Sequence, residues 1–192
     1  MKTTRNLTII LICTICFAGQ EPVAEHRLAS SLQRKLDHIQ QNAGSGQPDD
    51  TPTVMTEEEI NDYFATRRVK LPQGVKRITF EGHSGVVTSF ATIDFDEIRA
   101  GQRSSNPLLS LFNGTHSVRI EADAAGAGGV GKVHVLSVAL DGTEIPRMAL
   151  EFFVAKFLKP KYPRVGLDSE FQMPDKINVA VVSYHKLTIT QK

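Results

Sequence analysis

The chain has 192 residues, with 22 basic and 21 acidic side chains, a net charge of +1 and two cysteines. A charge this close to zero gives a nucleic acid or an anionic surface no overall attraction, which argues against a nucleic-acid-binding protein. Both cysteines, Cys13 and Cys16, lie in the first 19 residues. A chain without that segment has no cysteine for a disulfide, a metal site or a nucleophile.

The N-terminus has the pattern of a secretory signal. Lys2 and Arg5 precede an uncharged apolar run from Leu7 to Ala18. A run of this length is too short to cross a bilayer as a helix, which takes roughly 20 residues. We therefore expect residues 1–19 to be a signal peptide and the protein to be exported, either periplasmic or extracellular. An uncleaved segment that tethers the protein to the membrane is the alternative.

Residues 20–53 contain a predicted amphipathic helix and a linker. The helix has one narrow apolar stripe, with spacings of four, four and three, made of Leu28, Leu32, Leu36 and Ile39. The stripe is interpreted as a spacer, as a short coiled-coil seam or as a docking site for a partner protein. The segment Asn42–Pro52 is rich in Gly, Pro, Asp and Ser, which predicts a flexible linker. A single domain is then expected over residues 54–192.

The first part of this domain predicts a helix and a hairpin. Thr56 and Glu59 have the spacing of a capping box, so a short helix is expected from there to about Arg67. Apolar residues then alternate with polar ones from Val75 onward and from Val86 to Phe95, as in half-buried strands. The Gly82–Gly85 segment between them predicts a hairpin turn.

A second hairpin is expected after Phe112. His116–Asp123 alternates as a strand, and the glycine-rich Ala124–Gly131 is interpreted as a flexible loop rather than a phosphate-binding loop, because a strand and not a helix follows it. The next strand, Lys132–Leu140, has apolar residues on both faces: Val133, Val135 and Ala139 on one, Leu136, Val138 and Leu140 on the other. This predicts burial on both sides.

The sequence of the last third of the chain predicts a hydrophobic helix and three strands. Asp141-Gly142 indicates a turn, and Pro146–Leu158 is apolar around most of its circumference, so it is either buried or faces lipid. Strands are expected near Leu167–Met173, Ile177–Val182 and Leu187–Thr190. The predicted fold class is α+β, a curved antiparallel meander wrapped around the hydrophobic helix and preceded by the amphipathic helix and linker.

The polar residues favour a protein that is not an enzyme. The six histidines are scattered without metal-ligand spacing, and no G-x-S-x-G nucleophile motif occurs. The carboxylate pairs Asp94/Asp96 and Asp168/Glu170 have the spacing of a solvated strand face. We therefore expect no metal and no cofactor. An enzymatic site would require several histidines to meet these carboxylates in one cleft.

The order of features from Met55 onward resembles bacterial exported proteins of the tubular lipid-binding (TULIP) superfamily, in particular LmeA-like and YpmS-like proteins. The resemblance rests on Thr56–Asn61, Val133–Leu140, the turn Gly142–Pro146, the helix Met148–Leu158, and Leu167-Asp168 with the run Ile177–Ile189. It implies a twisted sheet wrapped around the hydrophobic helix, with an apolar groove for acyl chains. It implies no catalytic residue.

These observations lead to an expected function. The protein is expected to bind a phospholipid or similar amphiphile, with peripheral membrane contact, for lipid transport or homeostasis in the cell envelope. The expected groove residues are Leu108, Leu109, Leu111, Phe112, Leu136, Val138, Leu140, Met148, Phe152, Phe153 and Phe157. The alternative is a structural or adaptor protein in which the same residues form an ordinary packed core, and the size of any internal apolar cavity distinguishes the two.

Overall fold

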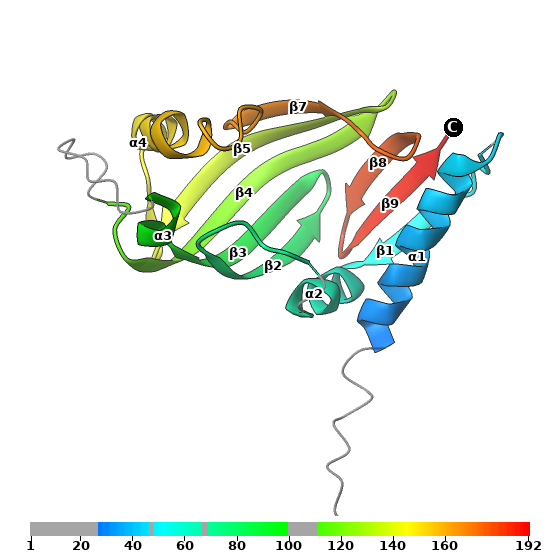
Figure 1. The fold of residues 1–192 in the computed structure, drawn as a ribbon, viewed down its shortest axis with the longest axis horizontal. Coiled ribbons are helices and arrows are strands. Elements are labelled where there is room, and N and C mark those ends of the chain that lie inside the picture. Colours follow the sequence, from blue (N-terminus) through cyan, green and yellow to red (C-terminus); the bar gives the residue numbers. More distant parts are fainter. Residues whose placement is uncertain (1–26, 47, 67–68, 100–110) are drawn as a thin grey trace, which may run out of the picture.

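A computed structural model describes residues 27–46, 48–66, 69–99 and 111–192. The expected signal peptide and the groove residues Leu108 and Leu109 lie outside these ranges. The described chain is an α+β protein with one large, open antiparallel sheet and a few helices, which confirms the predicted class (Figure 1).

The elements follow one another in a mixed order of helices and strands. They are α1 (Arg27–Gly44), β1 (Thr53–Thr56), α2 (Glu57–Ala65), β2 (Val75–His83), β3 (Val86–Asp94), α3 (Phe95–Arg99), β4 (Thr115–Ala127), β5 (Val130–Leu140), β6 (Thr143–Glu144), α4 (Arg147–Phe153), the π-helical turn η2 (Val154–Leu158), β7 (Asp168–Gln172), β8 (Ile177–Ser183) and β9 (Lys186–Gln191).

Strand β4 lies at the centre of the sheet and pairs with three other strands. The order of the strands in the sheet differs from that of a simple meander. One edge of β4 pairs with β5 along most of its length. Its other edge pairs first with β3 and then, beyond Asp123, with β8 at Ala125 and Gly126. The full order is β1-β9-β8-β4-β3-β2, and β5 also pairs with β6 and β7. The C-terminal hairpin thus returns to the middle of the sheet, which short-range sequence patterns do not encode.

The glycine-rich segment Ala124–Gly131 is strand rather than loop, contrary to the prediction. Pairing continues to Ala127 opposite Val130, so only Gly128 and Gly129 form the turn. Both have positive φ, 60° and 80°. A two-residue turn with positive φ at both positions matches the twist of a hairpin and favours glycine. The glycines therefore allow two long strands to run to a tight tip.

Helix α2 begins at the predicted capping box and covers one sheet edge. Thr56 Oγ1 accepts from the Glu59 backbone N–H at 3.2 Å, and Glu59 Oε2 accepts from the Thr56 N–H at 2.9 Å, which confirms the box. Farther along, the Asn61 side chain donates to the Phe80 carbonyl and accepts from its N–H. Asn61 thus occupies hydrogen-bonding groups of β2 that an edge strand leaves open.

The apolar side chains form two separate clusters. Under α1 and α2, Leu32 and Ile39 are buried with Met55 and Ile189, and Leu36 packs against them. Leu28, at the start of α1, is exposed. The other cluster lies between the sheet and α4. The apolar stripe of α1 therefore packs on the chain's own sheet, and α1 is part of the folded unit.

Within the described residues, no helix has both the length and the apolar character needed to cross a membrane.

Candidate functional site

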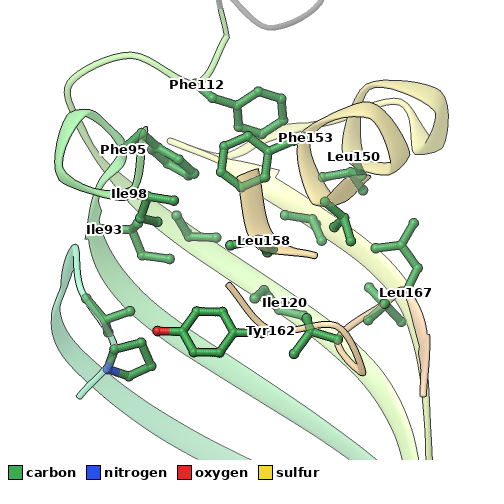
Figure 2. Close-up of a pocket in the computed structure, with 18 of the residues that line it drawn as sticks. Ile93, Phe95, Ile98, Phe112, Ile120, Leu150, Phe153, Leu158, Tyr162 and Leu167 are labelled. Carbon is green, nitrogen blue, oxygen red and sulfur yellow. The ribbon is translucent and has the colours of Figure 1, made fainter. Parts of the chain in front are cut away.

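An apolar cavity of about 420 Å³ lies between the sheet and the α4–η2 segment (Figure 2). Its size falls within the range of about 300–1,000 Å³ that is usual for small-molecule sites. The lining comes from β2 to β5, α3, α4, η2, the connections Pro72-Gln73 and 161–167, and Phe112 in the segment before β4. The lining residues are Pro72, Gln73, Val75, Ile93, Phe95, Ile98, Phe112, Val118, Ile120, Val135, Val138, Leu140, Leu150, Phe153, Val154, Leu158, Lys161, Tyr162, Val165, Gly166 and Leu167.

A β-bulge in β5 decides which side chains of this strand reach the cavity. Glu121 pairs with Ser137 but Ala122 pairs with Val135, so Leu136 is an extra residue in β5. A bulge breaks the two-residue alternation, and Val135 consequently lines the cavity together with Val138 and Leu140. Leu136 is 47% exposed. The two apolar faces inferred from the sequence are therefore largely one face interrupted by a bulge.

The helical wall of the cavity changes its winding at Val154. Helix α4 passes into η2, where the Lys159 N–H donates to the Val154 carbonyl at 2.9 Å, five residues back. Such π turns are rare and often lie at functional sites. Val154 and Leu158 of this segment line the cavity, as does Phe153 at the end of α4.

One end of the cavity is closed by aromatic rings. The rings of Phe112 and Phe153 stack with centroids 4.4 Å apart, and Phe95 meets each of them at 5.4 Å. Phe112 is almost completely buried, at 1% exposure. Figure 2 shows Phe112 and Phe153 at one end of the cavity and Tyr162 at the other. The aromatic end is therefore closed to solvent.

The other end is bordered by the connection from η2 to β7. Tyr162 and Val165 line the cavity and are also exposed, so this is where the cavity meets solvent. Lys161 Nζ donates to the Ile98 carbonyl at 2.9 Å and to Gln73 Oε1 at 3.3 Å. These bonds tie the connection to α3 and to the segment before β2. The mouth thus combines the Lys161 ammonium group, the Gln73 amide and the Tyr162 hydroxyl with apolar side chains.

The predicted groove residues separate into three sets. Phe112, Val138, Leu140 and Phe153 line the cavity, and Phe157 is buried in the adjoining cluster. Leu111, Leu136, Met148 and Phe152 are exposed and do not contribute to the described lining. Leu108 and Leu109 fall outside the described residues.

Sequence patterns did not identify the mouth. Residues 159–166 contain two prolines and predict only a loop before the strand expected near Leu167–Met173, and Ile93 and Ile120 fall in predicted strands. The available signal was the pair Tyr162 and Val165, two large side chains in a segment whose other residues are mainly basic residues and prolines.

The histidines meet carboxylates at three separate places. His116 contacts Asp141 at 2.6 Å, His185 contacts Glu57 at 2.8 Å, and His134 contacts Asp168, which also accepts from Arg147 at 2.8 Å. Strand register places His134 opposite Asp123 and His116 opposite Ile93, so these two histidines do not meet across the hairpin. Within the described ranges, no three potential metal ligands come together.

The ion pair at Asp168 fixes the start of α4 relative to the sheet. The hydrogen bond with His134, and then the charge of Arg147, hold the pKa of Asp168 below its ordinary value. Arg147 also pairs with Glu151 at 3.2 Å, as its spacing predicts. Because Arg147 begins α4, and Asp168 begins β7 beside β5, these exposed contacts join the start of the helix to the sheet.

The fold and cavity together describe an α+β protein with a sizeable apolar cavity, open at one end, between its sheet and a helix. Comparisons with family models, with curated proteins and with solved structures find no match to this chain.

Proposed function

We propose that this chain is an exported, non-catalytic binding protein that holds an acyl chain of a phospholipid or similar amphiphile, for lipid transport or homeostasis in the cell envelope. The observation that carries the proposal is the cavity of about 420 Å³, whose described lining is apolar except for Gln73, Lys161 and the hydroxyl of Tyr162. Apolar cavities of this kind suit apolar ligands, because they offer few polar partners to water.

Export is proposed from the N-terminal sequence, where Lys2 and Arg5 precede the apolar run Leu7–Ala18. The proposal also includes the TULIP-like arrangement, in which a sheet curves around a hydrophobic helix. It is supported by the packing of Leu150 and Phe153 of α4 against Val118 and Val138 of the sheet.

The direct test is to identify what the protein carries. Native mass spectrometry and organic extraction of the purified full-length protein should reveal an amphiphile bound at one molecule per chain. Stripped protein should then take up a fluorescent acyl chain from vesicles. Absence of both bound amphiphile and uptake would contradict the proposal.

A matched pair of substitutions locates the binding. Val135→Phe places a larger side chain in the cavity, so uptake should fall by about tenfold or more while the fold remains. Leu136→Phe makes a similar change at the next residue, which is exposed on the bulge, and uptake should be unchanged. Circular dichroism and thermal melts check that both variants fold. Equal uptake by the two variants would place the ligand elsewhere.

A structural or adaptor role is the second candidate, and one feature of α4 favours it. Met148 and Phe152 lie four residues apart and are 62% and 47% exposed. Residues with this spacing share a helix face, and an exposed apolar pair can contact a partner protein. If this role is the correct one, extraction should yield no amphiphile, and Val135→Phe should not affect association with the partner.

A further inference from the structure

The mouth of the cavity carries a positively charged side chain, Lys161, whereas the interior is apolar. Lys161 is a lining residue, and the described lining contains no carboxylate to pair with it. Its ammonium group donates to two acceptors, the Ile98 carbonyl and Gln73 Oε1. An ammonium has three N–H donors, and these two acceptors are the ones found for it among the described residues, so the third donor can serve a ligand at the mouth.

The segment around Lys161 strengthens this positive character. Between Phe152 and Leu167 the chain has four basic residues, Lys156, Lys159, Lys161 and Arg164, and no acidic one. The chain as a whole is nearly neutral, with a net charge of +1. Lys159, Lys161 and Arg164 belong to the connection that borders the open end of the cavity, where positive charge attracts an anion, whereas Lys156 lies 5.6 Å from the Phe157 ring.

The volume limits the apolar part of the ligand. If a methylene group takes about the 30 Å³ that water occupies in the liquid, a cavity of about 420 Å³ holds roughly 14 carbons. This is enough for one acyl chain of medium length. The closed aromatic end around Phe112 and Phe153 suits the methyl end of the chain, which places its polar end at Lys161.

We propose that the cavity binds a single-chain anionic amphiphile, a fatty acid or a similar chain with one terminal anionic group, whose headgroup contacts the Lys161 ammonium at the mouth. This inference rests on the proposed function and narrows it to a ligand class. It assigns Lys161 as the residue that distinguishes an anionic headgroup from a neutral or cationic one. A two-chain phospholipid leaves at least one chain outside.

Three ten-carbon ligands with the same chain test the headgroup preference: decanoate, decanol and decyltrimethylammonium. Binding to the full-length protein is measured by titration calorimetry at pH 8, where the carboxylate is ionised. Decanoate should bind about tenfold or more tightly than decanol, because a hydrogen bond to a charged group is stronger than one between neutral groups. Decyltrimethylammonium should bind most weakly.

Substitution of Lys161 separates its role from that of general charge. Lys161→Met should lower the affinity for decanoate to about the affinity of the same variant for decanol, and circular dichroism with a thermal melt checks that the variant folds. Lys159→Met removes the same charge from the same connection at a residue that does not line the cavity. Its effect on decanoate should be less than about twofold, as for a screened exposed charge.

The outcomes distinguish the inference from the function on which it rests. If decanoate and decanol bind equally, or if Lys161→Met and Lys159→Met have the same effect, the headgroup assignment is wrong and the apolar binding function stands. If a two-chain phospholipid binds more tightly than decanoate, the single-chain assignment is wrong. If no ligand of any class binds, the proposed function itself fails.

Discussion

A buried carboxylate, Glu59, connects the first two helices. Only 5% of Glu59 is exposed, and its side chain accepts from Lys35 Nζ at 2.5 Å and from Ser31 Oγ at 2.6 Å, both on α1. The same carboxylate completes the capping box of α2 through the Thr56 N–H. One side chain thus caps its own helix and fixes a second helix against it.

These contacts determine the ionisation of Glu59. Burial alone raises the pKa of a carboxyl group, but hydrogen bonds from Lys35, Ser31 and Thr56 outweigh it, and the pKa of Glu59 lies below its ordinary value. A lowered pKa means that the ionised form is stabilised by folding. The contribution of Glu59 to stability is therefore present above its unfolded pKa and is lost as the pH falls through its folded pKa.

Glu59→Gln should lower the free energy of unfolding by about 2 kcal/mol at pH 7, because it breaks a largely buried ion pair. Urea unfolding measures the loss. The difference from the wild type should shrink as the pH falls below the ordinary pKa of a glutamate. Glu58→Gln is the matched control at an exposed position in the same helical turn, with an expected change within about 0.5 kcal/mol. A difference that stays constant down to acid pH would contradict this account.

Among the elements, α4 presents two adjacent phenylalanines to different environments. Phe153 is 5% exposed and contacts the rings of Phe95, Phe112 and Phe157. Phe152 is 47% exposed and does not line the cavity. Neighbouring residues on a helix point about 100° apart, so this separation follows from the helical geometry.

Phe153→Ala should cost about 3–5 kcal/mol of unfolding free energy, the usual loss for a buried phenylalanine. Phe152→Ala should cost less than about 1 kcal/mol and leave amphiphile uptake unchanged, since its side chain lies outside the cavity. Chemical denaturation and the vesicle uptake assay measure the two effects. Similar losses of stability in both variants would mean that α4 is enclosed on all sides.

The sequence could predict this helix but not its orientation over the sheet. Periodicity places strands and helices correctly where the side-chain pattern is local, as at the Thr56 capping box and the Gly82–Gly85 hairpin. Periodicity gives the wrong face where a bulge interrupts the alternation of side chains along a strand. The bulge at Leu136 moves Val135 to the cavity face, and no residue type in β5 marks that position.

Long-range pairing explains the rest of what the sequence left open. The cavity takes its walls from segments as distant as Pro72 and Leu167, so its lining depends on the whole topology. The partner of the α1 stripe was also undetermined, because an apolar stripe specifies that it must be covered but not by what. The structure places Met55 and Ile189 there. They come from β1 and β9, which lie far apart in the sequence but pair in the sheet.

At the scale of the whole molecule, the two apolar clusters belong to one sheet, and along its path β1-β9-β8-β4-β3-β2 the shortest pairing is that between β4 and β8. The pairing between these strands consists of Ala125 with Val181 and Gly126 with Ala180. A Cβ atom on Gly126 would lie 2.9 Å from the Cβ of Ala180 and 2.6 Å from Met173 Sδ. Met173 has a flexible side chain that can move away, whereas the Ala180 Cβ is fixed by its strand.

Gly126→Ala should therefore lower the free energy of unfolding by about 1–3 kcal/mol, as overpacking does in a close-packed region. The clash lies at the junction of the two parts of the sheet, so amide hydrogen exchange should increase in both β3 and β9, on either side of it. Gly46→Ala is the control, because no heavy atom lies within 4 Å of the added Cβ and stability should change by less than about 0.5 kcal/mol. Equal stability of the two variants, or exchange that increases on one side alone, would show that the clusters are not coupled through the β4–β8 pairing.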